Sequence, residues 1–144
     1  MPASIFIDDN DENSVITVIV FIANGKKGFV YCDIDHSKLL KMAGDDVTES
    51  DIEQHQVLFK QPSYGDTSRI FSSGIRMGAD EEINISPSQI RQERLCVLLK
   101  SWTFKNSAGK DMAATKDNVK KLHPAIAMIL GIALEKELSE RGLL

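Results

Sequence analysis

The sequence lacks any apolar run long enough to cross a membrane, and it contains only two cysteines in 144 residues. A membrane-spanning helix needs roughly 18 or more consecutive apolar residues. The most hydrophobic segment, residues 125–134, is far shorter and fits a buried helix. The first residues have neither the basic start nor the long apolar core of a signal peptide. We therefore expect no membrane association and a cytoplasmic location.

The two cysteines do not have the spacing pattern of a disulfide framework or a zinc site. Cys32 and Cys96 lie 64 positions apart, and each is embedded in an apolar stretch. Free cysteine behaves as a small apolar residue in protein cores, and disulfides are rare inside cells. This pattern predicts two reduced, core-packed thiols in preference to a disulfide or a zinc site.

Catalytic and metal-binding motifs are also missing. The histidines, His36, His55 and His123, show no close pairing with cysteine or glutamate at ligand spacing. The acidic segment 8–12 offers oxygen ligands but lacks the glycine and distal glutamate of an EF-hand loop. Neither Gly-x-Ser-x-Gly nor a phosphate-binding glycine loop occurs. We predict no catalytic residue, no metal and no cofactor, unless folding brings His55 or His123 to a serine, cysteine or carboxylate in a pocket.

A basic excess is absent as well. The net charge of −4 and the pI near 5.4 argue against a binder dominated by nucleic-acid phosphates. Local clusters do occur, and Arg91 and Arg94 stand one helical turn apart. They could meet an acidic partner or a phosphate, although a solvated helix face explains the same spacing. Other basic residues on the predicted helices are Lys100, Lys116, Lys120 and Lys121.

What is present indicates an α+β fold of the size of one domain, residues 1–144. Residues 14–22 are rich in β-branched side chains, and the Asn24-Gly25 turn separates them from a second strand at 28–32. Residues 4–7 can add a third strand, which gives an antiparallel hairpin or meander. We expect a β-rich part at 1–35, a mixed part at 36–85 and a helical unit at 86–144.

The middle of the chain alternates turns with short elements. We expect a capped helix at 35–44, a polar linker at 45–56 and a short strand at 57–59. A helix then follows the turn at 62–67, capped by Asp66 or Thr67. Its buried stripe comprises Ile70, Phe71 and Ile75, and residues 77–82 read as a loop.

The last third of the chain has the clearest signals for the starts of helices. Ser86, Pro87 and Gln89 have the spacing of a helix start, and this helix is predicted to end near Trp102. Thr115 begins a second unit, and His123-Pro124 starts a long terminal helix.

The terminal helix points to an interaction surface. Met128 and Ile132 place apolar surface outside its main stripe, so the helix is apolar over more than half its circumference through residue 134. Such a helix is either central in the fold or binds another chain. Trp102 and Phe104 are core anchors or the centre of an interface. The candidate partner-binding residues are Trp102, Phe104, Met128, Ile132, Arg91 and Arg94.

The C-terminal half resembles the tail assembly chaperones of long-tailed bacteriophages. The phrases that carry this resemblance are FKQPSYGD (59–66), IRQERL (90–95), LLKSW (98–102) and NVKKLHPAI (118–126). The family has a similar succession: a Pro-Ser turn into a helix, a Leu-Leu-x-Ser-Trp phrase, a polar loop and a last helix opened by Leu-x-Pro.

The resemblance implies a non-enzymatic protein that binds tape measure and tail tube proteins in the cytoplasm of the infected cell. The β-rich residues 4–35 form a larger part than that mainly helical family would have, so two other interpretations stay open. One is a virion structural protein of the tail or connector, which would form homo-oligomers. The other is a small phage-borne inhibitor of a host protein.

Overall fold

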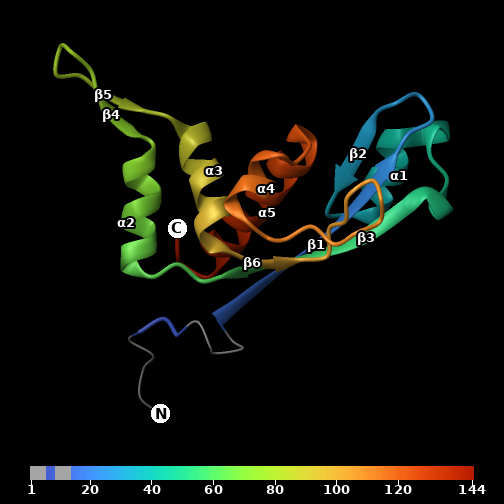
Figure 1. The fold of residues 1–144 in the computed structure, drawn as a ribbon, viewed down its shortest axis with the longest axis horizontal. Coiled ribbons are helices and arrows are strands. Elements are labelled where there is room, and N and C mark those ends of the chain that lie inside the picture. Colours follow the sequence, from blue (N-terminus) through green and yellow to red (C-terminus); the bar gives the residue numbers. More distant parts are fainter. Residues whose placement is uncertain (1–5, 9–13) are drawn as a thin grey trace.

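The first predicted strand is a long inner strand of a four-stranded antiparallel sheet (Figure 1). The computed structural model describes residues 6–8 and 14–144. The sheet has the order β2-β1-β3-β6, formed by β1 (Val15–Asn24), β2 (Val30–Asp33), β3 (Ile52–Lys60) and β6 (Leu99–Trp102). Side chains alternate along a strand, so Ile16, Val18 and Val20 enter the core while Ile19 stays exposed. The predicted hairpin is confirmed, with Asn24 of β1 opposite Val30 of β2.

The predicted helix after the hairpin is also confirmed. The Asp35 carboxylate accepts hydrogen bonds from two backbone N–H groups at the start of α1 (His36–Ala43), and Gly44 ends the helix at φ +57°. Short 3-10 turns follow at Gly44–Asp46 and Glu49–Asp51. The Asp46 carboxylate accepts from the Tyr31 hydroxyl and from the Lys27 N–H, which fixes the β1–β2 turn.

The prediction of a polar linker at 45–56 was wrong for the second half of this segment. Strand β3 starts at Ile52 and pairs with β1 along its whole length, so residues 53–56 belong to the sheet. Their polar side chains gave little strand signal. Backbone pairing with the apolar β1 overrides that weak local preference.

The helix after the Pro62 turn is capped differently from the prediction. The Ser63 side chain is the N-cap of α2 (Tyr64–Ser73), and Asp66 completes a reciprocal capping box. Of its predicted buried stripe only Ile70 is buried, because Phe71 is exposed and Ile75 belongs to a strand. The loop predicted at 77–82 is the turn of a hairpin between β4 (Ile75–Met77) and β5 (Ile83–Ile85).

The helix predicted from Ser86 forms but ends earlier than expected. Ser86 caps α3 (Pro87–Leu98), as predicted, with its hydroxyl accepting from the Gln89 N–H. Residues predicted to finish the helix instead form β6, in which Trp102 stands opposite Val57 of β3. The segment predicted as purely helical therefore completes the sheet. Pairing with β3 outweighs the helical preference of the Leu-Leu-Lys sequence.

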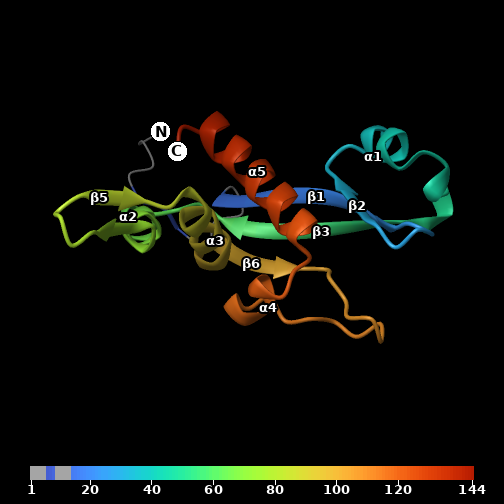
Figure 2. The ribbon, with the colours of Figure 1, turned by 90° about the horizontal axis from the view of Figure 1, so that it is seen from above.

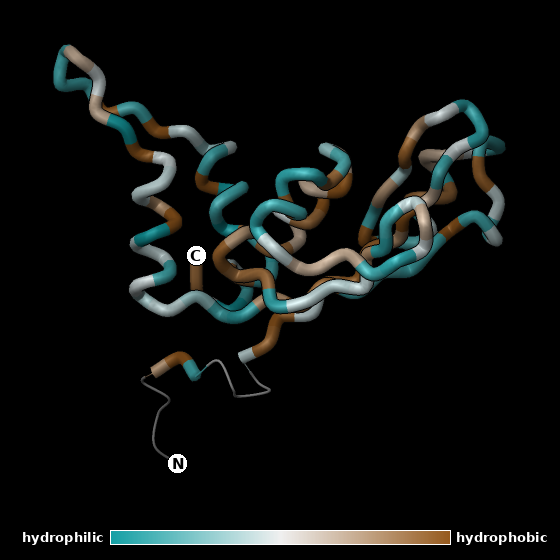
Figure 3. The backbone as a smooth tube through the Cα atoms, in the orientation of Figure 1, coloured by the Kyte–Doolittle hydropathy of each residue, from teal (hydrophilic) through white to brown (hydrophobic). Residues whose placement is uncertain are grey.

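The last two helices are α4 (Lys116–Lys120) and α5 (Pro124–Glu140). Helix α5 lies across one face of the sheet (Figure 2), and its apolar residues meet those of the strands near the middle of the molecule (Figure 3). The fully buried side chains of this core include Ile16, Val20, Val57, Phe59, Leu98, Leu130, Leu134 and Leu138.

The predicted α+β class, with an N-terminal antiparallel sheet and C-terminal helices, is confirmed. The expected third strand at 4–7 lies mostly outside the described residues, and Phe6 and Ile7 belong to no strand. The acidic segment 8–12 is described only at Asp8. In the described part of the chain, no helix combines the length and apolar character needed to cross a membrane.

Candidate functional site

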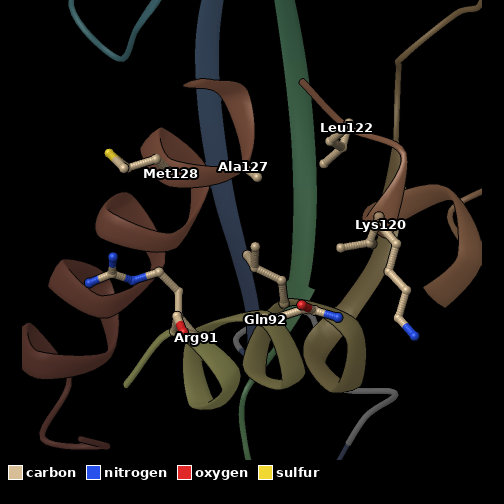
Figure 4. A pocket seen from close by; sticks show the side chains of 9 residues that line it. Arg91, Gln92, Lys120, Leu122, Ala127 and Met128 are labelled. Atoms are coloured by element: carbon tan, nitrogen blue, oxygen red, sulfur yellow. The ribbon is translucent and has the colours of Figure 1, made fainter. Parts of the chain in front are cut away.

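A mainly apolar hollow of the described surface lies between α3, α4 and the first half of α5 (Figure 4). We call it the three-helix groove, and its volume is about 270 Å³. It is lined by Ser88, Arg91, Gln92, Leu95, Val119, Lys120, Leu122, Ala127 and Met128. Apolar side chains supply most of the lining, while polar groups stand mainly on the α3 side and at Lys120.

Local capping fixes the helices that build this groove. The Thr115 hydroxyl accepts from the Asn118 N–H at the start of α4, and the Asn118 side chain donates to the Ala113 carbonyl. His123 Nδ1 accepts from the Ala125 N–H and so caps α5. These bonds satisfy backbone groups at the starts of the two helices and so stabilise the short α4, since an isolated helix of its length would not be stable.

One carboxylate joins α3 to α5. Glu135 Oε1 accepts from Arg91 Nε and from Arg94 Nη1, each at 3.0 Å, and Glu135 Oε2 accepts from Arg91 Nη2 at 3.3 Å. The hydrogen bonds that Arg91 donates to Glu135 raise the pKa of Arg91. Burial lowers the pKa of Arg94, and the charge of Glu135 opposes that effect. Both arginines remain cations at neutral pH because their ordinary pKa is above 12.

The two arginines therefore occupy different positions. Arg94 is buried behind the contact between the helices, so the solvated helix face offered as an explanation does not apply to it. Arg91 is partly exposed and lies on the α5 side of the groove (Figure 4).

Neither Trp102 nor Phe104 lines the groove, and Trp102 lies beneath it. Trp102 shares a narrow internal space with Leu95, Val119 and Leu122, whose other sides face the groove. Its indole Nε1 donates to the Met112 carbonyl at 2.6 Å, and its ring centre is 5.0 Å from that of buried Phe104. Trp102 thus supports the groove floor from the core side, and Phe104 packs against Trp102.

The first half of α5 is incompletely packed. Met128 is 56% exposed and Ile132, one turn further along, is 49% exposed. Between residues 125 and 132 only Leu130 and Gly131 are buried. The predicted apolar surface outside the main stripe is present, and it continues from the groove along α5.

The charges at the groove are of one sign. Arg91 and Lys120 stand on opposite sides of it in Figure 4, and the lining residues, all of them described, include no carboxylate. Nearby Lys116 lies 3.6 Å from Glu93, whereas Lys120 forms no ion pair with any of the described side chains. Two cationic side chains therefore flank an apolar floor on a chain of net charge −4.

An enzyme would require that folding brings His55 or His123 to a serine, cysteine or carboxylate in a pocket. The surroundings of His55 meet part of this condition. Its Nε2 is 3.0 Å from Glu53 Oε2, and its Nδ1 is 3.1 Å from the Thr103 hydroxyl, beside a shallow hollow. The same hydroxyl accepts from the Gln56 N–H, while the Glu53 side chain is 72% exposed. This cluster ties the residue after β6 to β3, and water screens its carboxylate. That the chain is not an enzyme stays a prediction.

The other histidines and the cysteines considered as catalytic or metal-binding residues lie apart from one another. His36 stacks edge-on against Phe21, and His123 caps α5. Cys32 and Cys96 are free thiols, and burial raises the pKa of both, that of Cys32 to about 12. Over residues 6–8 and 14–144, no group of three or more histidine, cysteine or acidic side chains is placed to hold a metal ion.

Of the six residues predicted to bind a partner, the structure places Arg91 and Met128 at the groove and Ile132 on its continuation. Sequence reasoning missed the contribution of α4 and the turn after it, namely Val119, Lys120 and Leu122. The available signal was the apolar Leu122 directly before the His-Pro restart. Comparison of the chain with family models, curated proteins and solved structures found no match in any of the three.

Proposed function

We propose that this chain is a non-enzymatic phage morphogenesis protein of the tail assembly chaperone type, acting in the cytoplasm of the infected cell. Its partners are tape measure or tail tube proteins, and its binding surface is the three-helix groove with the adjoining face of α5. The succession of motifs in the C-terminal half supports the family. The groove supports binding as the activity.

The observation that carries the proposal is the incomplete packing of α5 beside the groove. A chain of 144 residues buries few large side chains, and Leu130, Leu134 and Leu138 of α5 are among them. The same helix leaves Met128 and Ile132 in water next to an apolar hollow. Contiguous exposed apolar surface of this kind marks a binding site for another protein.

The test is affinity capture of the tagged chain from phage-producing cells, after phage particles have been removed, with mass spectrometry of the bound proteins. A tape measure or tail tube protein in the bound fraction is the expected result. Recovery of the tagged chain only with the particles would instead favour a virion structural protein. Recovery of a host protein in place of phage proteins would favour the inhibitor.

A matched pair of variants makes the capture specific to the groove. Met128 and Met42 are 56% and 55% exposed, and both lie on helices, but only Met128 lines the groove. Met128→Glu should abolish capture while Met42→Glu preserves it. Equal capture by both variants would remove the groove from the proposal.

A further inference from the structure

We propose that the occupant of the three-helix groove is an amphipathic helical segment whose apolar stripe is flanked by acidic residues. This inference rests on the proposed function in one respect, that the chain binds another protein. It adds the chemistry of the segment that is bound.

The size of the groove sets how much of a partner enters it. A cavity of about 150 Å³ accommodates a benzene molecule, so the groove, at about 270 Å³, has room for about two aliphatic side chains. Leu95, Val119 and Leu122 form an apolar floor for them. Two neighbouring side chains on one face of a helix, separated by three or four residues, fill such a space together.

The shape of the surrounding surface favours a helix over an extended strand. The groove is walled by helices α3, α4 and α5, and none of its lining residues belongs to a strand. Its lining therefore presents side chains in place of the free backbone N–H and C=O groups that an added strand needs. Met128 and Ile132 extend the apolar surface along α5 by one helical turn, which suits anchors at i, i+4 and i+7 of a bound helix.

The positive charges at the groove favour a bound helix with acidic residues on both sides of its apolar stripe. Lys120 stands on one side of the groove and Arg91 on the other, and Glu135 holds the Arg91 guanidinium in place. One Glu135 carboxylate serves both Arg91 and Arg94, so this group of three keeps a net positive charge. Acidic residues on both sides of an apolar stripe would lie against these cations, and lysines there would be repelled.

The test uses the full chain with ¹³C-labelled methionine methyl groups and two synthetic helical peptides. Both peptides carry leucine at i, i+4 and i+7 positions. One has glutamate and the other lysine at the flanking positions. We expect the acidic peptide to shift the Met128 methyl resonance and leave that of Met42 in place. The lysine peptide should bind at least about tenfold more weakly, because like charges meet at the rim.

A second matched pair isolates the charge. Lys120 and Lys41 each lie in the last turn of a helix and are exposed, but Lys41 is on α1, away from the groove. Lys120→Glu should weaken binding of the acidic peptide about tenfold, and Lys41→Glu should leave it unchanged. The circular dichroism spectrum and melting temperature of each variant check that the fold is intact.

Three results would overturn the inference: no shift of Met128 with the acidic peptide, equal affinity for both peptides, or a Met128 shift produced by a single-stranded DNA 15-mer in place of the peptide. Failure of the inference and failure of the proposed function are distinguishable. If Lys120→Glu still captures a tape measure or tube protein as well as the native chain does, the function stands and the acidic-helix inference fails. If the acidic peptide shifts Met128 but the native chain captures no such protein, the inference stands and the proposed function fails.

Discussion

Gly131 of α5 lies so close to Arg91 of α3 that a Cβ atom at position 131 would stand 2.6 Å from Arg91 Cδ. The absence of a side chain lets the Arg91 stem pass over α5 and reach Glu135 one turn later. The three-helix groove therefore depends on a glycine in the middle of a helix, where glycine costs about 1 kcal/mol relative to alanine. The close approach of the two helices offsets that cost.

Gly131→Ala should destabilise the protein by about 1 kcal/mol, although alanine is the better helix former. In an Arg91→Ala background the clash is gone, so the same substitution should stabilise by about 0.5–1 kcal/mol. Urea unfolding of the four proteins in this cycle measures the difference. An equal gain in both backgrounds would mean that α3 and α5 can separate without cost.

Glu135→Ala should lower the free energy of unfolding by about 3 kcal/mol, because it leaves Arg94 buried without its ion-pair partner. Glu137→Ala on the same helix is the control, since its i,i+4 pair with Arg141 is partly exposed and worth at most about 0.5 kcal/mol. Combining Glu135→Ala with Arg94→Met should recover much of the loss. If the two single variants unfold alike, the Arg94–Glu135 pair does not hold the helices together.

Cys32 should resist alkylation in the folded protein. Burial, with a smaller effect of the Asp33 charge, raises the pKa of its thiol from 9.0 to about 12. At pH 8 its thiolate fraction, and so its labelling rate, should be at least about a hundredfold lower than in the urea-unfolded chain. The pKa of Cys32 is higher in the folded than in the unfolded protein, so its shift contributes to the free energy of unfolding. This contribution is complete below pH 9.0 and is lost as the pH rises towards about 12.

Two measurements check this prediction. Mass spectrometry after timed iodoacetamide treatment follows each cysteine, and unfolding at pH 8 and pH 11 follows the stability. Cys32→Ala should lose less stability than the native chain between these two pH values. Labelling of Cys32 in the folded protein at the unfolded rate would contradict its burial in the core.

Trp102→Ala should destabilise the protein by about 2–4 kcal/mol, because the ring packs on Phe104 beneath the groove floor. Trp102→Phe keeps most of the packing and loses the bond to the Met112 carbonyl, so it should cost about 1 kcal/mol. Thermal unfolding compares the two. An unchanged melting temperature for Trp102→Ala, together with loss of partner capture, would instead place Trp102 in the interface.

The elements that could be predicted from the sequence are those whose signals are local. The β-branched run before Asn24 predicted β1, and the Ser86-Pro87 phrase predicted the start of α3. The apolar Met128 and Ile132 predicted the exposed face of α5. Each of these signals lies within a few residues of the structure that it specifies.

The features that were missed depend on distant pairing. β6 forms because Leu99 and Trp102 stand opposite Phe59 and Val57 of β3, which no local pattern reveals. The groove likewise needs α4 to pack beside α3, and the shared role of Glu135 needs α3 and α5 to meet. A glycine in a helix signals such a contact only weakly, because its partner is 40 residues away at Arg91.

The most direct test of the central claim is site-specific photo-crosslinking in phage-producing cells. A photoreactive amino acid replaces Met128 in one version of the tagged chain and Met42 in the other, since these positions match in exposure but only one lines the groove. We predict that position 128 crosslinks to a tape measure or tail tube protein and that position 42 does not. Crosslinking of such a protein from position 42 alone, or from neither position, would contradict the account.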